Sequence, residues 1–111
     1  MTSPASVPEE FVQVLVGESM KAEARVWRGT LRGLLDAELP VALDRITAST
    51  LLIWGDQDAF VTDDQKVLLD GIPDARQVVY VGGGHGPHLA EPDRVVPDIV
   101  DFLTLVASKN A

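Results

Sequence analysis

Two short apolar runs, each followed by glycine, place the strongest constraint on how this chain can fold. Thr50–Trp54 ends at Gly55, and Gln77–Val81 ends at three successive glycines. Runs of this length, bounded by turn residues, are typical of parallel strands that are buried on both faces of a sheet. Residues 62–71 between them begin with the N-capping residue types of Thr-Asp-Asp and continue with helical spacing. The order strand, helix, strand predicts a right-handed parallel crossover.

Helical patterns surround this unit. They predict helices over residues 8–18, 21–36 and 92–106, and a helical turn over 41–46. We therefore expect an α/β fold with two parts, a helical segment over 1–45 and a parallel β-α-β-α unit over 46–111. Two strands alone leave open edges, so this unit reads as one end of a larger sheet.

Composition narrows the class of protein. With 111 residues the chain suits one small domain, and it contains no cysteine, which excludes disulfides and a thiol nucleophile. A net charge of −8 with scattered basic residues argues against nucleic-acid binding. The apolar runs are too short to span a membrane, and the N-terminus lacks a signal-peptide pattern, so we expect a soluble cytoplasmic protein with no membrane partner.

An aspartate and a histidine follow the two predicted strands. Asp58 lies in the turn after the first strand and His85 in the turn after the second, 85 − 58 = 27 residues later. Ligand sites of open α/β sheets form outside the carboxyl ends of strands, so these side chains can meet there. A carboxylate that accepts the imidazole N–H fixes its tautomer and stabilises the imidazolium. Asp58 and His85 are therefore the candidate catalytic residues, and we expect no cofactor.

The sequence segments around these two residues resemble those of a known protein family. TLLIWGDQDAFV over 50–61, IPDAR over 72–76, Gly84-His85, Glu91-Pro92 and Phe102-Leu103 resemble the C-terminal part of α/β-hydrolases, in the esterase, epoxide-hydrolase and haloperoxidase-like branch. The resemblance implies that residues 1–45 are cap helices, that Asp58 is the acid of a catalytic triad, and that His85 is its base. It also implies hydrolysis of a small-molecule, ester-like substrate.

The nucleophile of such a triad is missing from the sequence. The family places it in a G-x-S-x-G elbow between a strand and a helix, and this chain has no such motif. Ser19 follows an apolar run, but Lys21 stands where the elbow requires a small residue, so a helix serine is the preferred interpretation. The oxyanion-hole segment is absent too. We expect a truncated hydrolase that is inactive alone.

Several alternatives remain open at this point. Asp56-x-Asp58 is similar to the motif of Mg²⁺-dependent phosphatases, although Phe60 does not fit it, and the open strand edges suggest a self-associating module without enzymatic activity. His85, His88 and Glu91 could be imagined as metal ligands, but prolines interrupt their spacing, so we expect no metal. The glycines over 82–84 lack the Lys-Ser/Thr of a P-loop. We expect Trp27 and Trp54 to pack in the protein rather than stack on a substrate.

Overall fold

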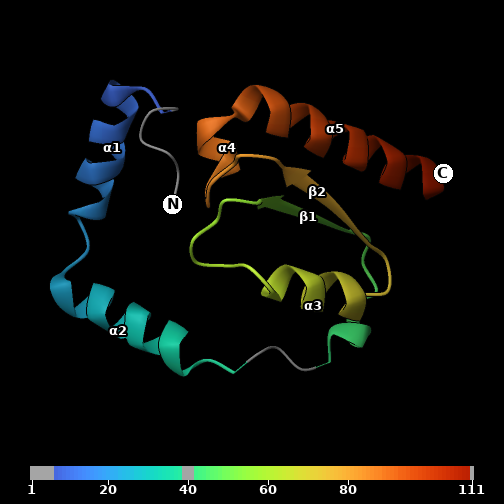
Figure 1. The fold of residues 1–111 in the computed structure, drawn as a ribbon, viewed down its shortest axis with the longest axis horizontal. Helices are drawn as coiled ribbons and strands as arrows, with labels where there is room; N and C mark the ends of the chain where they lie inside the picture. Colours follow the sequence, from blue (N-terminus) through green and yellow to red (C-terminus); the bar gives the residue numbers. More distant parts are fainter. Residues whose placement is uncertain (1–6, 39–41, 111) are drawn as a thin grey trace. The chain divides into compact units, whose positions relative to one another are not determined.

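The computed structural model describes residues 7–38 and 42–110, which form two separate compact units. Residues 7–38 contain only helices, α1 (Glu9–Ser19) and α2 (Ala24–Asp36). Residues 42–110 contain, in order, η2 (Leu43–Arg45), β1 (Thr50–Gly55), α3 (Asp64–Gly71), β2 (Ala75–Tyr80), α4 (Pro87–Ala90) and α5 (Pro92–Lys109) (Figure 1). The predicted turn over 41–46 corresponds to η2, with residue 41 outside the described residues.

The sheet consists of β1 and β2, which pair in parallel. Their register runs from Thr50 beside Ala75 to Gly55 beside Tyr80, so the carboxyl ends of the two strands are adjacent. The chain passes from β1 to β2 through α3, and Figure 1 shows α3 on one side of the strands and α5 on the other. The predicted parallel crossover is confirmed, and the unit is an α/β structure.

The expectation that both strands are buried on both faces is wrong for the described residues. In β1 only Gly55 is buried, in β2 only Tyr80, and Val81 just beyond β2 is 80% exposed. The reason is geometric, since a two-stranded sheet gives each strand one neighbour and one open edge. The buried apolar side chains of this unit are few: Ile72, Tyr80, Pro87 and Val95.

Tyr80, the last residue of β2, connects the sheet to α5 through two side-chain contacts. Its ring is 1% exposed, and its hydroxyl donates a hydrogen bond to the Asp98 carboxylate of α5. The guanidinium of Arg94, one turn earlier in α5, lies 4.8 Å from the ring centroid in a cation–π contact. Burial and the neighbouring Asp98 carboxylate raise the pKa of Tyr80 to about 12, so the ring stays neutral over the usual pH range.

The start of α3 and the position of Trp27 also differ from expectation. No side chain of Thr62-Asp63-Asp64 caps α3 by a hydrogen bond. Trp27 on α2 is 52% exposed, and its indole N–H donates to the carbonyl of Ser19, 3.1 Å away.

Over residues 7–38 and 42–110, no helix combines the length and apolarity needed to cross a bilayer.

Candidate active site

Two loops at the carboxyl edge of the sheet are joined by backbone hydrogen bonds. The amide of Asp56 donates to the carbonyl of Tyr80 at 3.2 Å, and the amide of Gln57 donates to the carbonyl of Gly83 at 2.8 Å. In the opposite direction, the amide of Gly82 donates to Oδ1 of Asp56 at 2.7 Å. Asp56 is therefore a structural acid that ties the second loop to the first.

Glycines allow the two loops to come this close. A Cβ at Gly55 would lie 2.2 Å from the carbonyl oxygen of Gly84 and 2.4 Å from that of Gly83, far inside any tolerated contact. Gly82 has a φ of +77°, a conformation that favours glycine. The close approach at Gly55 and the left-handed backbone at Gly82 therefore let the two loops lie against each other.

The Asp58 carboxylate is held on both of its oxygens. Oδ1 accepts hydrogen bonds from the backbone amides of Phe60 at 2.8 Å and Val61 at 3.1 Å, because the chain curls back over the carboxylate after Asp58. Oδ2 lies 2.8 Å from Nδ1 of His85. The Asp58 side chain is 5% exposed. A buried carboxylate with this many donors is fixed in one orientation.

The ionisation of Asp58 follows from the same contacts. Burial by itself raises the pKa of the carboxyl, but the hydrogen bonds from His85, Phe60 and Val61 outweigh it and lower the pKa of Asp58 below its ordinary value of 3.8. Asp58 is therefore an anion at neutral pH. An anionic carboxylate only accepts hydrogen bonds, so Nδ1 of His85 carries the proton of the shared bond.

His85 is oriented by Asp58 and open on its other side. Its side chain is 53% exposed, and its Nε2 has no hydrogen-bond partner among residues 7–38 and 42–110. In the neutral ring with Nδ1 protonated, Nε2 is an acceptor that can take a proton from an incoming group. The arrangement can thus do general acid–base chemistry at Nε2.

The structure brings together the two residues that the sequence singles out and leaves the other candidates apart. His88 is exposed on α4, a four-residue helix that the sequence analysis did not anticipate, and Glu91 pairs with Arg94 at 2.9 Å. In the described part of the chain, no three His, Asp or Glu side chains gather in a way that could hold a metal ion. The depression beside α5, lined by Arg76, Asp98 and Phe102 among others, contains neither Asp58 nor His85.

No serine within 7–38 and 42–110 stands in an elbow between a strand and a helix. Ser19 is the last residue of α1, and its hydroxyl donates to the helix carbonyl of Leu15 at 2.8 Å. Ser49 precedes β1, so it lies at the amino end of the strands, whereas His85 lies at their carboxyl end. The six residues of β1 separate the two by about 20 Å at about 3.3 Å per strand residue. Ser108 is in the last turn of α5.

Sequence reasoning missed the residues that support the pair. The amides of Phe60 and Val61 hold Asp58, and the Phe60 ring contacts the His85 ring edge to face. The indole N–H of Trp54 donates to the Val61 carbonyl at 3.0 Å and so closes the far end of the same loop. Backbone amides carry no sequence signal. The segment Ala-Phe-Val after Asp58 is the only sequence signal here, and it indicates family resemblance rather than these contacts.

Comparison with known proteins gave no match, whether to a protein-family model, to a curated protein or to a solved structure.

Proposed function

We propose that this chain supplies the acid and the base of an α/β-hydrolase catalytic triad, with Asp58 as the acid and His85 as the base. The observation that carries the proposal is the 2.8 Å contact between the buried Asp58 carboxylate and Nδ1 of a half-exposed His85, on neighbouring strand ends. The resemblance of residues 50–61 and 84–85 to the family supports the same roles. On this proposal, the chain is the C-terminal part of an α/β-hydrolase sheet, preceded by cap helices.

The proposed chemistry uses Nε2 of His85 twice. Nε2 takes the proton of a nucleophilic hydroxyl as its oxygen attacks the ester carbonyl, and Asp58 stabilises the imidazolium. The imidazolium then gives this proton to the leaving alcohol. In the second half, Nε2 takes a proton from water as the water oxygen attacks the acyl-enzyme. The imidazolium then returns this proton to the oxygen of the nucleophile as its bond to the acyl group breaks and the acid is released. The nucleophile and the oxyanion donors come from outside the described residues.

The experiment compares two forms of the protein, the present chain and the chain extended by whatever protein segment its gene encodes upstream. With a chromogenic short-chain ester, we expect turnover only in the extended form, and we expect His85→Gln to abolish it. His88→Gln is the matched control, since it removes the other histidine of the chain. Turnover by the present chain that depends on His85, or an upstream segment without an elbow serine, would contradict the proposal.

A second candidate function is self-association through the sheet. The specific observation is that β1 and β2 each have an unpaired outer edge within the described residues, with Val79 39% exposed on β2. Such edges pair readily with another chain, and a lysine on the edge strand blocks pairing. We expect Val79→Lys to shift sedimentation towards the monomer. A chain that is monomeric at all concentrations would remove this candidate.

The phosphatase-like alternative gains no support from the geometry. Asp58 is committed to His85 and two amides, and Asp56 accepts the Gly82 amide.

A further inference from the structure

The hydrogen bond to Asp58 restrains the His85 ring at one atom only. The ring is half exposed, and only its Nδ1 is bonded within the described residues. Rotation about the last torsion of histidine is broad and roughly two-fold, so the ring can turn over and exchange Nδ1 for carbon. A general base that turned over would lose both its contact with Asp58 and the aim of Nε2. A second contact with the ring would add to the restraint that Asp58 provides.

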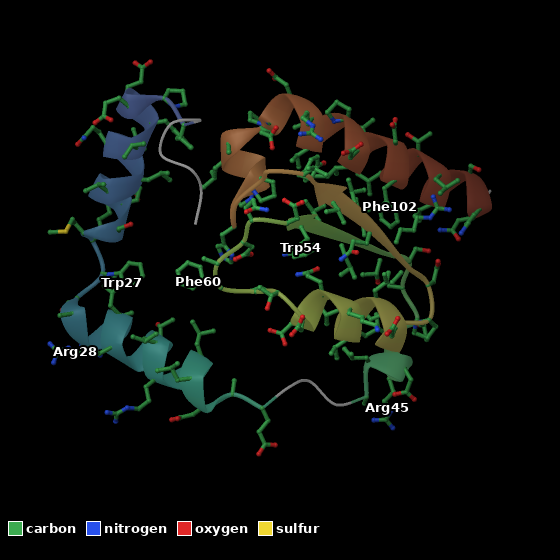
Figure 2. The ribbon with its side chains drawn as sticks, in the orientation of Figure 1. Trp27, Arg28, Arg45, Trp54, Phe60 and Phe102 are labelled. Atoms are coloured by element: carbon green, nitrogen blue, oxygen red, sulfur yellow. The ribbon has the colours of Figure 1, made fainter. Side chains whose placement is uncertain are left out.

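Phe60 is the residue placed to do this. Its ring centroid lies 5.5 Å from that of His85, with an angle of 71° between the ring planes. This is the edge-to-face geometry that aromatic pairs prefer, within their usual range of about 4.5–7 Å. Figure 2 shows the Phe60 ring projecting from the loop after β1, away from the strands. The ring is 66% exposed, so its placement beside His85 is not explained by core packing.

The same residue also holds the acid. The backbone amide of Phe60 donates to Oδ1 of Asp58 at 2.8 Å, while its side chain contacts His85. Phe60 therefore touches both members of the pair through different groups. The amide contact orients the carboxylate, and the ring contact flanks the imidazole.

We propose that Phe60 is a positioning residue, whose ring keeps His85 in the orientation that points Nδ1 at Asp58 and leaves Nε2 available. The proposal rests on the function proposed above, but it concerns the ring's orientation and can be tested without hydrolysis. Truncation of the Phe60 side chain leaves the backbone amide, and hence the contact with Asp58, in place. It therefore separates the role of the ring from the role of the loop.

The test is nuclear magnetic resonance of the purified chain with isotopically labelled histidine. The chain has only two histidines, so His88→Gln assigns the His85 ring signals. In the parent chain we expect one dominant Nδ1–H tautomer. In Phe60→Ala we expect the ratio of this tautomer to the other to fall by about two- to twelvefold, the worth of an aromatic pair. Phe60→Tyr keeps the ring and should restore the parent signals.

Two outcomes would overturn the proposal. The first is an unchanged His85 tautomer ratio in Phe60→Ala with the Val61 and Gly82 amide signals at their parent positions. Where those amide signals show that Phe60→Ala disturbs the loop, Phe60→Leu decides, since it keeps apolar bulk and lacks the ring. A parent-like tautomer ratio in Phe60→Leu is the second outcome. Neither result bears on hydrolysis, so failure here and failure of the triad proposal remain distinguishable.

Discussion

The carbonyl oxygen of Gly84 lies so close to Gly55 that no side chain fits on the Cα of Gly55. The position of a Cβ on Gly55 is 2.2 Å from the Gly84 carbonyl oxygen, and a backbone atom cannot yield as a flexible side chain can. This contact joins the end of β1 to the loop that carries His85. The closeness of Asp58 and His85 therefore depends on a residue that takes no part in their chemistry.

Gly55→Ala should separate the two loops. We expect a loss of at least about 1–3 kcal/mol in the free energy of unfolding, the usual cost of overpacking, together with loss of the Asp58–His85 contact. Urea unfolding followed by tryptophan fluorescence measures the first, and histidine resonances measure the second. Gly29→Ala is the control, since a Cβ at Gly29 meets nothing within 4 Å and alanine favours the helix. Equal stability of the two variants would contradict this prediction.

Asp58→Asn should reverse the tautomer of His85. The asparagine oxygen can still accept from the Phe60 and Val61 amides, so its nitrogen faces His85 as a donor, and Nδ1 must then accept. We expect the proton to move to Nε2 and stability to fall by about 1–3 kcal/mol. Asp56→Asn serves as the matched control, because it keeps an oxygen for the Gly82 amide and leaves His85 untouched. An Nδ1–H tautomer in Asp58→Asn would refute the assignment.

Acid should weaken the fold through Asp58. Its pKa in the folded protein lies below the ordinary value of 3.8 that applies to the unfolded chain. The unfolded state therefore binds this proton first as the pH falls. The stabilisation is fully present above the unfolded value and is lost as the pH falls through the folded value.

Urea midpoints between about pH 7 and about pH 2 measure this loss. The parent chain should lose more stability than Asp58→Asn over that window, and the two curves should converge at its acidic end. Parallel curves would show that Asp58 has the same pKa in both states.

Alkali should lower the stability of the fold through Tyr80, because folding raises the pKa of Tyr80 whereas it lowers that of Asp58. The pKa of Tyr80 rises from 10.0 to about 12 on folding, so the folded state keeps its proton longer. Its contribution is complete below pH 10.0 and is lost as the pH rises to about 12. Tyr80 is the only tyrosine, so ultraviolet absorbance reports its ionisation directly. Tyr80→Phe should lower stability at neutral pH and flatten the alkaline decline, and an equally steep decline would contradict this.

The sequence predicted elements well where burial and periodicity agree, and poorly where the chain turns. β1 was expected over 50–54 and ends at Gly55, because the apolar run and the glycine coincide there. β2 was expected over 77–81 but spans Ala75–Tyr80, because it pairs with β1 from Thr50 beside Ala75 to Gly55 beside Tyr80, which leaves Val81 beyond the ladder. The four residues of α4 are too few to show a helical period.

The candidate site was also predictable only in part. Asp58 and His85 could be predicted to meet, because parallel strands put their carboxyl ends at one edge of the sheet. The amides on Asp58 and the ring contact of Phe60 could not, because they depend on how the loop curls after Asp58, and only backbone torsions decide that. The partial exposure of the strands could not be predicted either, because residue type does not determine how many neighbouring strands a strand pairs with.

The parallel pairing of β1 with β2 has a consequence for how such a protein can be divided. Both members of the acid–base pair, the glycines that admit their contact and the Phe60 that touches both lie within residues 50–86, one crossover of the chain. A cut or fusion before Thr50 leaves every one of these contacts inside a single piece. On the proposed function, the protein is therefore suited to reassembly from two separately made halves, in which activity itself reports that the halves have met.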